Sequence, residues 1–262
     1  MASILTRRTL LQTAVAGVAG ASLRAADLPT LGLIFPPAGR GIPEEGLAMY
    51  PTSVKFLAEG LGLKTMTPDG YDAVLERIVP TAQRLAKDGA KAIVLMGTSL
   101  SFYKGTAFNQ KLSDTIHQAT GLPATTMSTA VLEGLRAVGA KRVAVATAYN
   151  EEVNDRLLAF LKESGFAVEI VRGLGIEKVE DINSVTQPAL IEFCADVRKQ
   201  AANADAMLVS CGGLRTLEII QPVEQRTKIP VVSSTPHALR AGARLLGLDG
   251  RAPGFGTLLS KA

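Results

Sequence analysis

The sequence predicts an α/β protein with two pseudo-symmetric lobes, each a parallel sheet flanked by helices, and an active site in the cleft between them. From residue 30, short β-rich runs alternate with segments of helical periodicity, which is the pattern of repeated βαβ units. Two stretches also resemble each other, since "AIVLMGTSLSF" (92–102) aligns with "AMLVSCGGLRT" (206–216). A second pair, 120–139 and 226–247, follows the same order, which favours two related lobes with matched loops.

The predicted strands are short runs rich in apolar and β-branched residues. In chain order they are 30–35, 61–66, 91–96, 123–126, 142–147, 166–171, 206–210 and 229–234. Segments between them, such as 71–89 and 154–165, have helical periodicity. We expect one lobe from 29–136 together with 234–262, and a second lobe from 137–233.

Residues 1–28 are predicted to be a twin-arginine signal peptide. Arg7 and Arg8 precede an apolar stretch, Leu10 to Leu23, that is short and rich in Ala and Gly, and so poorly suited to spanning a membrane. We therefore expect a periplasmic protein, or a cytoplasmic one if the leader is not functional. An uncleaved anchor is the alternative, but after cleavage we expect no stable membrane partner.

The charge of the chain gives no support for a nucleic-acid partner. The whole sequence has 28 basic and 24 acidic residues, but residues 1–25 hold three arginines and no acidic residue. The remainder is therefore nearly neutral, and the sequence pI of about 9.1 comes largely from the leader. Aromatic residues make up only 5% and Trp is absent, so the stacking platforms of single-stranded nucleic-acid binders are missing.

The cysteines and histidines do not form a metal motif. Cys194, Cys211, His117 and His237 match no zinc spacing, and no P-loop, Rossmann fingerprint or Ser-His-Asp arrangement is present. We expect no metal and no cofactor. Cys194 lies in a helix-like segment and is most simply a core residue, while a disulfide with Cys211 is the alternative in an oxidising compartment.

Two aligned turns carry groups that suit an anionic substrate. Thr98 and Ser99 follow Gly97 at the end of a predicted strand, where hydroxyl and backbone N–H groups can bind an anion or cap a helix. At the matching place Cys211 precedes Gly212 and a further glycine, which allow the backbone to approach a ligand closely. A core cysteine followed by a plain turn is the alternative. Because Cys211 aligns with Gly97, only one lobe presents a thiol to the cleft.

Two further segments are candidates for the cleft. Tyr149 follows the predicted strand 142–147, where its phenol could donate to an oxyanion or simply begin a helix. Pro36 and Pro37 follow the first strand and could form a rigid wall or a loop.

The motifs "LIFPPAG", "TPDGYDAV", "LMGTSLSFYKG" and "LVSCGGLRTL" resemble the arylmalonate decarboxylase family, within the aspartate/glutamate racemase and maleate isomerase superfamily. The resemblance covers nearly all of residues 30–260 and implies two α/β lobes around one site. Racemases of this superfamily use two cysteines, one per lobe, whereas here Gly97 stands in the first position. Decarboxylation with protonation from one face needs a single acid, Cys211.

The resemblance implies a cofactor-independent decarboxylase of aryl- or alkenylmalonates that forms 2-arylpropionate-type monoacids. Thr98, Ser99, Tyr149 and the N–H of Gly212 would hold the enediolate, and Cys211 would protonate it. The family pattern also assigns four pocket residues: Pro36, Leu100, Val179 and Ile182. The expected partner is a small dicarboxylate, and we expect a monomer. The alternatives are an aspartate/glutamate racemase or maleate cis–trans isomerase, and a periplasmic carboxylate-binding protein.

Overall fold

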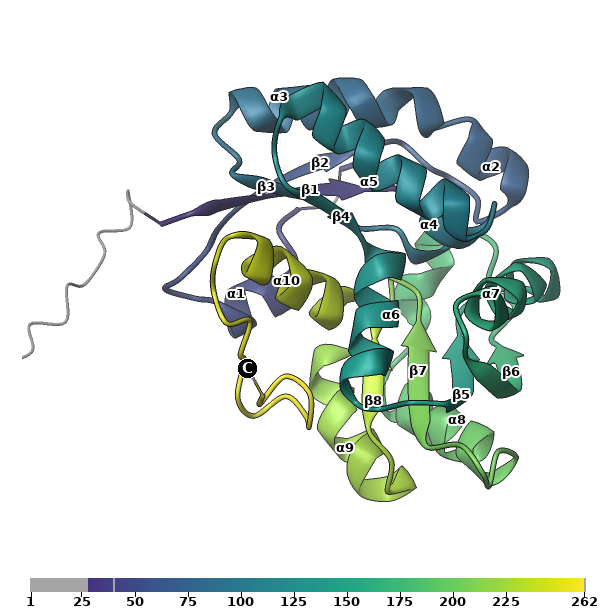
Figure 1. Ribbon diagram of the computed structural model, residues 1–262. Coiled ribbons are helices and arrows are strands. Elements are labelled where there is room, and N and C mark those ends of the chain that lie inside the picture. Colours follow the sequence, from purple (N-terminus) through teal and green to yellow (C-terminus); the bar gives the residue numbers. More distant parts are fainter. Residues whose placement is uncertain (1–27, 40, 262) are drawn as a thin grey trace, which may run out of the picture.

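The computed structural model describes residues 28–39 and 41–261 (Figure 1). The predicted leader, apart from its last residue, lies outside these ranges. Eight strands form two sheets of four, in the orders β2-β1-β3-β4 and β6-β5-β7-β8, and every paired strand runs parallel to its neighbour. The strands are β1 Thr30–Phe35, β2 Lys55–Gly60, β3 Ala92–Leu95, β4 Ala124–Thr126, β5 Arg142–Thr147, β6 Ala167–Gly173, β7 Ala206–Ser210 and β8 Val231–Ser233. The predicted fold class of two matched parallel sheets is confirmed.

The prediction of a strand at 61–66 is wrong. The second strand is β2, the segment just before it, which pairs with β1 along its whole length. β2 is an edge strand with exposed and half-buried positions, including Lys55 and Glu59, so its sequence is less apolar than that of a central strand. The apolar side chains of 61–66 are buried by tertiary packing instead.

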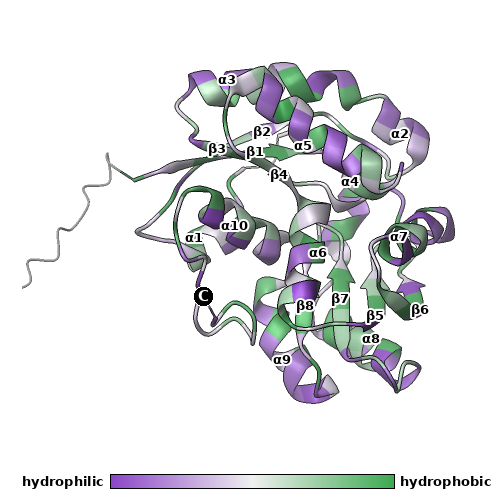
Figure 2. Cartoon of the chain, in the orientation of Figure 1, coloured by the Kyte–Doolittle hydropathy of each residue, from purple (hydrophilic) through white to green (hydrophobic). Residues whose placement is uncertain are grey.

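Helices surround the two sheets, and most of them carry both hydrophilic and hydrophobic residues (Figure 2). They are α1 Glu44–Met49, α2 Pro68–Asp72, η2 Leu75–Arg77, α3 Ile78–Lys87, α4 Thr98–Phe102, α5 Thr106–Thr120, α6 Met127–Ala137, α7 Glu151–Glu163, η3 Val179–Ser184, α8 Gln187–Lys199, α9 Leu217–Thr227 and α10 Ser234–Leu245. Side-chain caps stabilise the first turns of several helices. At the start of α7, for example, the Asn150 side chain accepts a hydrogen bond from Val153 N. Gly121, in the left-handed conformation, ends α5.

Two helices connect the lobes. α6 leaves the first sheet and packs against β7 and β8 of the second, whereas α10 leaves the second sheet and packs against β3 and β4 of the first (Figure 1). A glycine allows each close approach: a Cβ on Gly134 would lie 2.9 Å from Val232 Cγ1, and one on Gly242 would lie 2.5 Å from Leu31 Cδ2. The two sheets are therefore held together by an exchanged pair of helices.

The predicted lobe boundaries stay a prediction, because the exchange of α6 and α10 blurs any division by residue number. Across residues 28–39 and 41–261, no helix is long and apolar enough to cross a membrane.

Candidate active site

The turns that follow β3 and β7 meet at one small cavity. Its volume is about 40 Å³. The lining residues are Pro36, Pro37, Leu63, Met66, Met96, Gly97, Thr98, Ser99, Val179, Ile182, Cys211, Gly212 and Gly213. The turns are in direct contact, since a Cβ added to Gly212 would lie 3.2 Å from the Met96 carbonyl oxygen. The carboxyl ends of the two central strands thus bring together the two turns that the repeat aligned.

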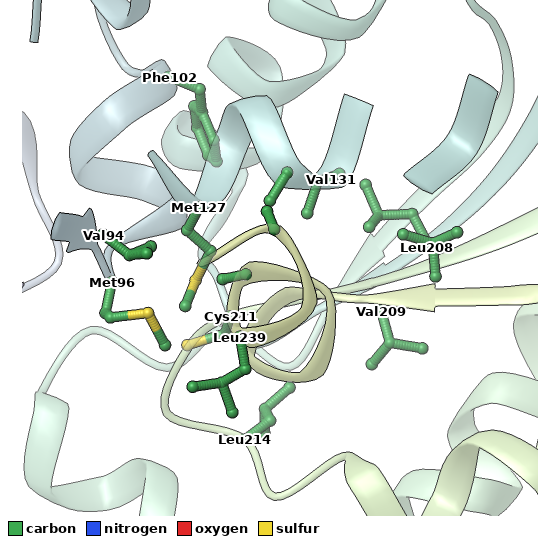
Figure 3. Close-up of a cluster of buried hydrophobic side chains, with 14 of the residues drawn as sticks. Val94, Met96, Phe102, Met127, Val131, Leu208, Val209, Cys211, Leu214 and Leu239 are labelled. Atoms are coloured by element: carbon green, nitrogen blue, oxygen red, sulfur yellow. The ribbon is translucent and has the colours of Figure 1, made fainter. Parts of the chain in front are cut away.

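Cys211 is a buried cysteine outside any disulfide, with only 4% of its surface exposed. Its Sγ accepts a hydrogen bond from Gly213 N at 3.4 Å. Figure 3 shows the sulfur among apolar side chains, with Met96, Met127 and Leu239 nearby. The Cys211 thiol thus lies in the same cavity lining as Thr98 and Ser99.

Ser234, the first residue of α10, links the two turns. Thr98 Oγ1 donates a hydrogen bond to Ser234 Oγ at 2.8 Å, and Cys211 N donates to the same oxygen at 3.2 Å. Ser234 is fully buried. The sequence analysis missed this residue, because a serine after a strand is read as an ordinary helix start.

Tyr149 lies just behind the cavity wall. Its hydroxyl is 3.3 Å from Ser210 Oγ and also interacts with the Thr98 side chain. Burial raises the pKa of Tyr149 well above its usual value, and the nearby Cys211 raises it further. Tyr149 N donates to Thr147 Oγ1 at 3.1 Å, which fixes the backbone at this point. The phenol is therefore a protonated hydrogen-bond donor held beside Thr98.

Tyr71, on α2, is a second buried tyrosine at the site that the sequence analysis did not identify. Its hydroxyl lies near Ser99 and Cys211, and burial raises its pKa above the usual value. The side chain is fully buried, and apart from the Ser99 side chain its hydroxyl has no hydrogen-bond partner among the described residues. A buried hydroxyl beside the site with so few partners is available to a ligand. The quoted motif "TPDGYDAV" contains this tyrosine, but its position depends on tertiary packing.

The predicted pocket residues divide into two groups. Pro36, Val179 and Ile182 line the cavity, whereas Leu100 is fully buried and does not. Leu100 lies on α4 beneath the turn, because a Cβ on Gly97 would be 3.1 Å from its Cβ. Leu63, Met66 and Met96 complete the apolar lining and were not anticipated.

Helix α1 supports the loop that follows Cys211. Glu44 pairs with Arg215 at 2.6 Å, and the buried Glu45 accepts a hydrogen bond from Thr216 N at 3.3 Å. These contacts hold the loop from Cys211 to Thr216 in place.

Cys194 lies away from the two turns. It is buried on α8, which packs against α9 and β5, and burial raises its pKa to about 12. The two cysteines are not joined by a disulfide, so the alternative of a disulfide between them is wrong for this structure. Among the described residues, no group of three or more His, Cys, Asp or Glu side chains could hold a metal ion.

Comparison with known proteins identifies close relatives. The family model "Arylmalonate decarboxylase" matches residues 31–259. The arylmalonate decarboxylase of Bordetella bronchiseptica is 48% identical over 241 residues, which cover 92% of this chain and all of that protein. A liganded crystal structure of an arylmalonate decarboxylase double mutant superposes with a TM-score of 0.85 at 49% identity, covering 88% of this chain and 98% of that one.

Maleate isomerases are more distant. That of Nocardia farcinica is 29% identical over 131 residues, about half of each protein. A maleate isomerase from Pseudomonas putida S16, crystallised with maleate, has a TM-score of 0.84 at 23% identity, over 90% of this chain and 98% of that one; it shows the same fold. Since the family model spans nearly all of the described residues, the chain belongs to the arylmalonate decarboxylase family.

Proposed function

We propose that this protein is a cofactor-independent decarboxylase of malonates that carry an α-aryl or α-alkenyl group. The observation that carries the proposal is the asymmetry of the two facing turns. Cys211 is the thiol on one side, while Gly97 occupies the matched position on the other, next to the buried hydroxyls of Thr98 and Ser99. A single thiol can protonate a carbanion from one face only. Identity of 48% with a decarboxylase of this class supports the same reaction.

The hydroxyl turn binds one carboxylate of the substrate. Thr98 and Ser99 donate hydrogen bonds to its oxygens, Tyr149 supports Thr98 from behind the wall, and the N–H of Gly212 adds a backbone donor. The buried hydroxyl of Tyr71, beside Ser99, is a further donor. These groups hold the enediolate that forms as CO2 leaves, and each donor of such an oxyanion hole contributes about 3 kcal/mol to transition-state stabilisation.

The second carboxylate lies against the apolar wall that includes Pro36, Met66 and Met96. Its C–C bond breaks, CO2 leaves, and the bonding electron pair moves into the enediolate, where the aryl or alkenyl group delocalises it. Cys211 Sγ–H then transfers its proton to the α-carbon. Water reprotonates the thiolate and restores the resting enzyme. No step requires an electron sink from outside the substrate and the protein.

The test is CO2 release from phenylmalonate and α-methyl-α-phenylmalonate. We expect turnover by the purified protein, a single product enantiomer from the methylated substrate, and a loss of about 10²–10⁴-fold in kcat for Cys211→Ala. Cys194→Ala is the matched control and should retain activity, because Cys194 lies outside the site. A folded protein that decarboxylates neither malonate would contradict the proposal. Turnover of maleate or aspartate in that case would favour the isomerase or racemase alternative.

We also propose that residues 1–28 direct the protein to the periplasm through the twin-arginine pathway. The support is the paired Arg7 and Arg8 before an apolar stretch. In cells, replacing both arginines with lysine should keep the protein in the cytoplasmic fraction. A periplasmic fraction of equal size for this variant would rule out the route.

A further inference from the structure

A second and larger pocket adjoins the cavity that contains Cys211. Its volume is about 680 Å³, and one of its walls also belongs to the inner cavity. The shared residues are Pro37, Leu63, Val179, Ile182 and Gly213. A substrate group that leaves the inner cavity past these side chains enters the outer pocket.

The sizes of the two spaces determine which part of a malonate each can hold. The inner cavity, at about 40 Å³, is a small fraction of the size of the outer pocket, at about 680 Å³. It is too small to hold a malonate head and an aromatic ring together. The α-substituent of the substrate must therefore extend into the outer pocket, where the shared apolar wall can pack against a ring.

The rest of the outer pocket's lining is mostly polar. It includes Lys64, Thr65, Lys178, Glu180 and Asn183. The two lysines come from different lobes, and a short antiparallel bridge between the lobes brings their backbones together. Met66 N donates to Glu177 O at 2.9 Å, and Val179 N donates to Lys64 O at 3.2 Å.

The two ammonium groups are not neutralised by neighbours. Both lysines are exposed, and within the described residues neither side chain takes part in an ion pair or a hydrogen bond. Glu180 is the one acidic residue in this lining, so the pocket carries a net positive charge. Positive charge at the end of a pocket attracts an anionic group on the ligand.

We propose that Lys64 and Lys178 form an anion subsite, and that the preferred substrate is a malonate whose α-aryl group bears a carboxylate at its far end. The proposal rests on the proposed function, because the reacting malonate head must occupy the inner cavity. The apolar wall then packs against the ring, while the lysines hold the distal carboxylate.

The kinetic test compares 4-carboxyphenylmalonate with its neutral, similarly shaped analogue 4-carbamoylphenylmalonate. We expect kcat/KM to favour the carboxylate by about threefold to tenfold, since each exposed ammonium–carboxylate pair contributes modestly. The preference should disappear in the Lys64→Gln/Lys178→Gln double variant and decrease as salt is added. Glu180→Gln should increase the preference for the carboxylate substrate, because it removes the negative charge from this lining. Phenylmalonate, which lacks a distal group, should lose no more activity in these variants than 4-carbamoylphenylmalonate does.

A matched control removes the same charge elsewhere. Lys87→Gln/Lys111→Gln changes two exposed lysines on α3 and α5, neither of which lines the pocket. This variant should keep the preference for the carboxylate. An equal loss in the control would mean that net charge, rather than a subsite, governs the effect, and would overturn the proposal.

Binding separates the subsite from the proposed reaction. Calorimetry should show that 4-carboxyphenylacetate binds about threefold to tenfold more tightly than 4-carbamoylphenylacetate, and that the difference is lost in Lys64→Gln/Lys178→Gln. This result without any malonate turnover would support the subsite and contradict the decarboxylase. If the protein turns over phenylmalonate but binds 4-carboxyphenylacetate and 4-carbamoylphenylacetate equally, the subsite is overturned and the decarboxylase is not.

Discussion

The two lobes share one strand order but differ where their central strands reach the cavity. After β3, helix α4 starts at Thr98, directly behind Gly97, and supplies two buried hydroxyls. After β7, the loop from Cys211 runs for six residues before α9 starts at Leu217. The same scaffold thus provides anion-binding donors on one side and one acid on the other. The difference indicates that the chemistry depends on a few turn residues rather than on the sheets.

Making the two turns alike should have the largest effect. Gly97→Cys adds a second thiol on the opposite face of the cavity, and we expect this variant to racemise 2-phenylpropionate. It should also be destabilised by about 1–3 kcal/mol, because a Cβ at position 97 would lie 2.5 Å from Pro36 Cγ and 3.1 Å from Leu100 Cβ. Chiral chromatography and urea unfolding measure the two effects.

Gly97→Ala separates these effects, because it adds the same Cβ without a thiol. It should lose similar stability and show no racemisation. A folded Gly97→Cys protein that leaves a single enantiomer unchanged over long incubation would show that the two turns do not face one α-carbon.

A second difference lies at the starts of the two exchanged helices. In α6, Thr126 Oγ1 accepts a hydrogen bond from Thr129 N at 3.1 Å, as a normal N-cap does. In α10 the matching third residue is Pro236, which has no N–H to donate. His237 contacts the Ser233 backbone instead: its Nδ1 lies 3.0 Å from Ser233 N and 2.8 Å from Ser233 O. The lobe that holds the thiol therefore depends on a neutral, buried histidine.

Because of His237, the free energy of unfolding should decrease as the pH is lowered. Burial lowers its pKa from 6.5 to about 4, and the nearby Arg240 lowers it slightly. Below pH 6.5 the unfolded chain binds a proton that the folded chain does not, so the free energy of unfolding should decrease by about 2 kcal/mol between pH 7 and pH 5. His237→Ala should be less stable at pH 7 and should lose this part of the slope. An unchanged slope in the variant would assign the pH dependence to other groups.

Much of this arrangement could be predicted from the sequence. The central strands are buried apolar runs, and parallel strands place their carboxyl ends at one edge, so Gly97, Thr98 and Cys211 could be expected to meet. The sequence does not show that β2, rather than 61–66, is the strand. β2 lies at the edge of its sheet, where charged residues such as Lys55 and Glu59 are tolerated, whereas the loop that follows it is more apolar. Alternation alone does not reveal which apolar run pairs with β1.

The residues that complete the site were harder to predict. Tyr71 belongs to a short helix far from the turns in sequence, and Ser234 reaches them only because α10 crosses to the other lobe. Leu100 follows the binding turn directly, but the helical geometry of α4 directs it into the core. Closeness in sequence therefore wrongly predicted Leu100 as a pocket residue. Tyr71 and Ser234 reach the site through tertiary contacts, and no local sequence pattern indicates them.

Removing the link between the two turns should have a smaller effect, and it tests whether they act together. Ser234→Ala deletes the oxygen that accepts from both Thr98 Oγ1 and Cys211 N. Met127 Sδ is then the remaining acceptor of the Thr98 hydroxyl, so the orientation of this hydroxyl in the site should change. We expect kcat/KM for phenylmalonate to fall about tenfold, equivalent to about 1.4 kcal/mol. Ser113→Ala, which deletes a hydroxyl that donates to Gln110 O in α5, is the control. If Ser234→Ala lowers Tm but keeps kcat/KM within twofold of the unsubstituted protein, Ser234 only packs α10, and the two turns bind and protonate the substrate independently.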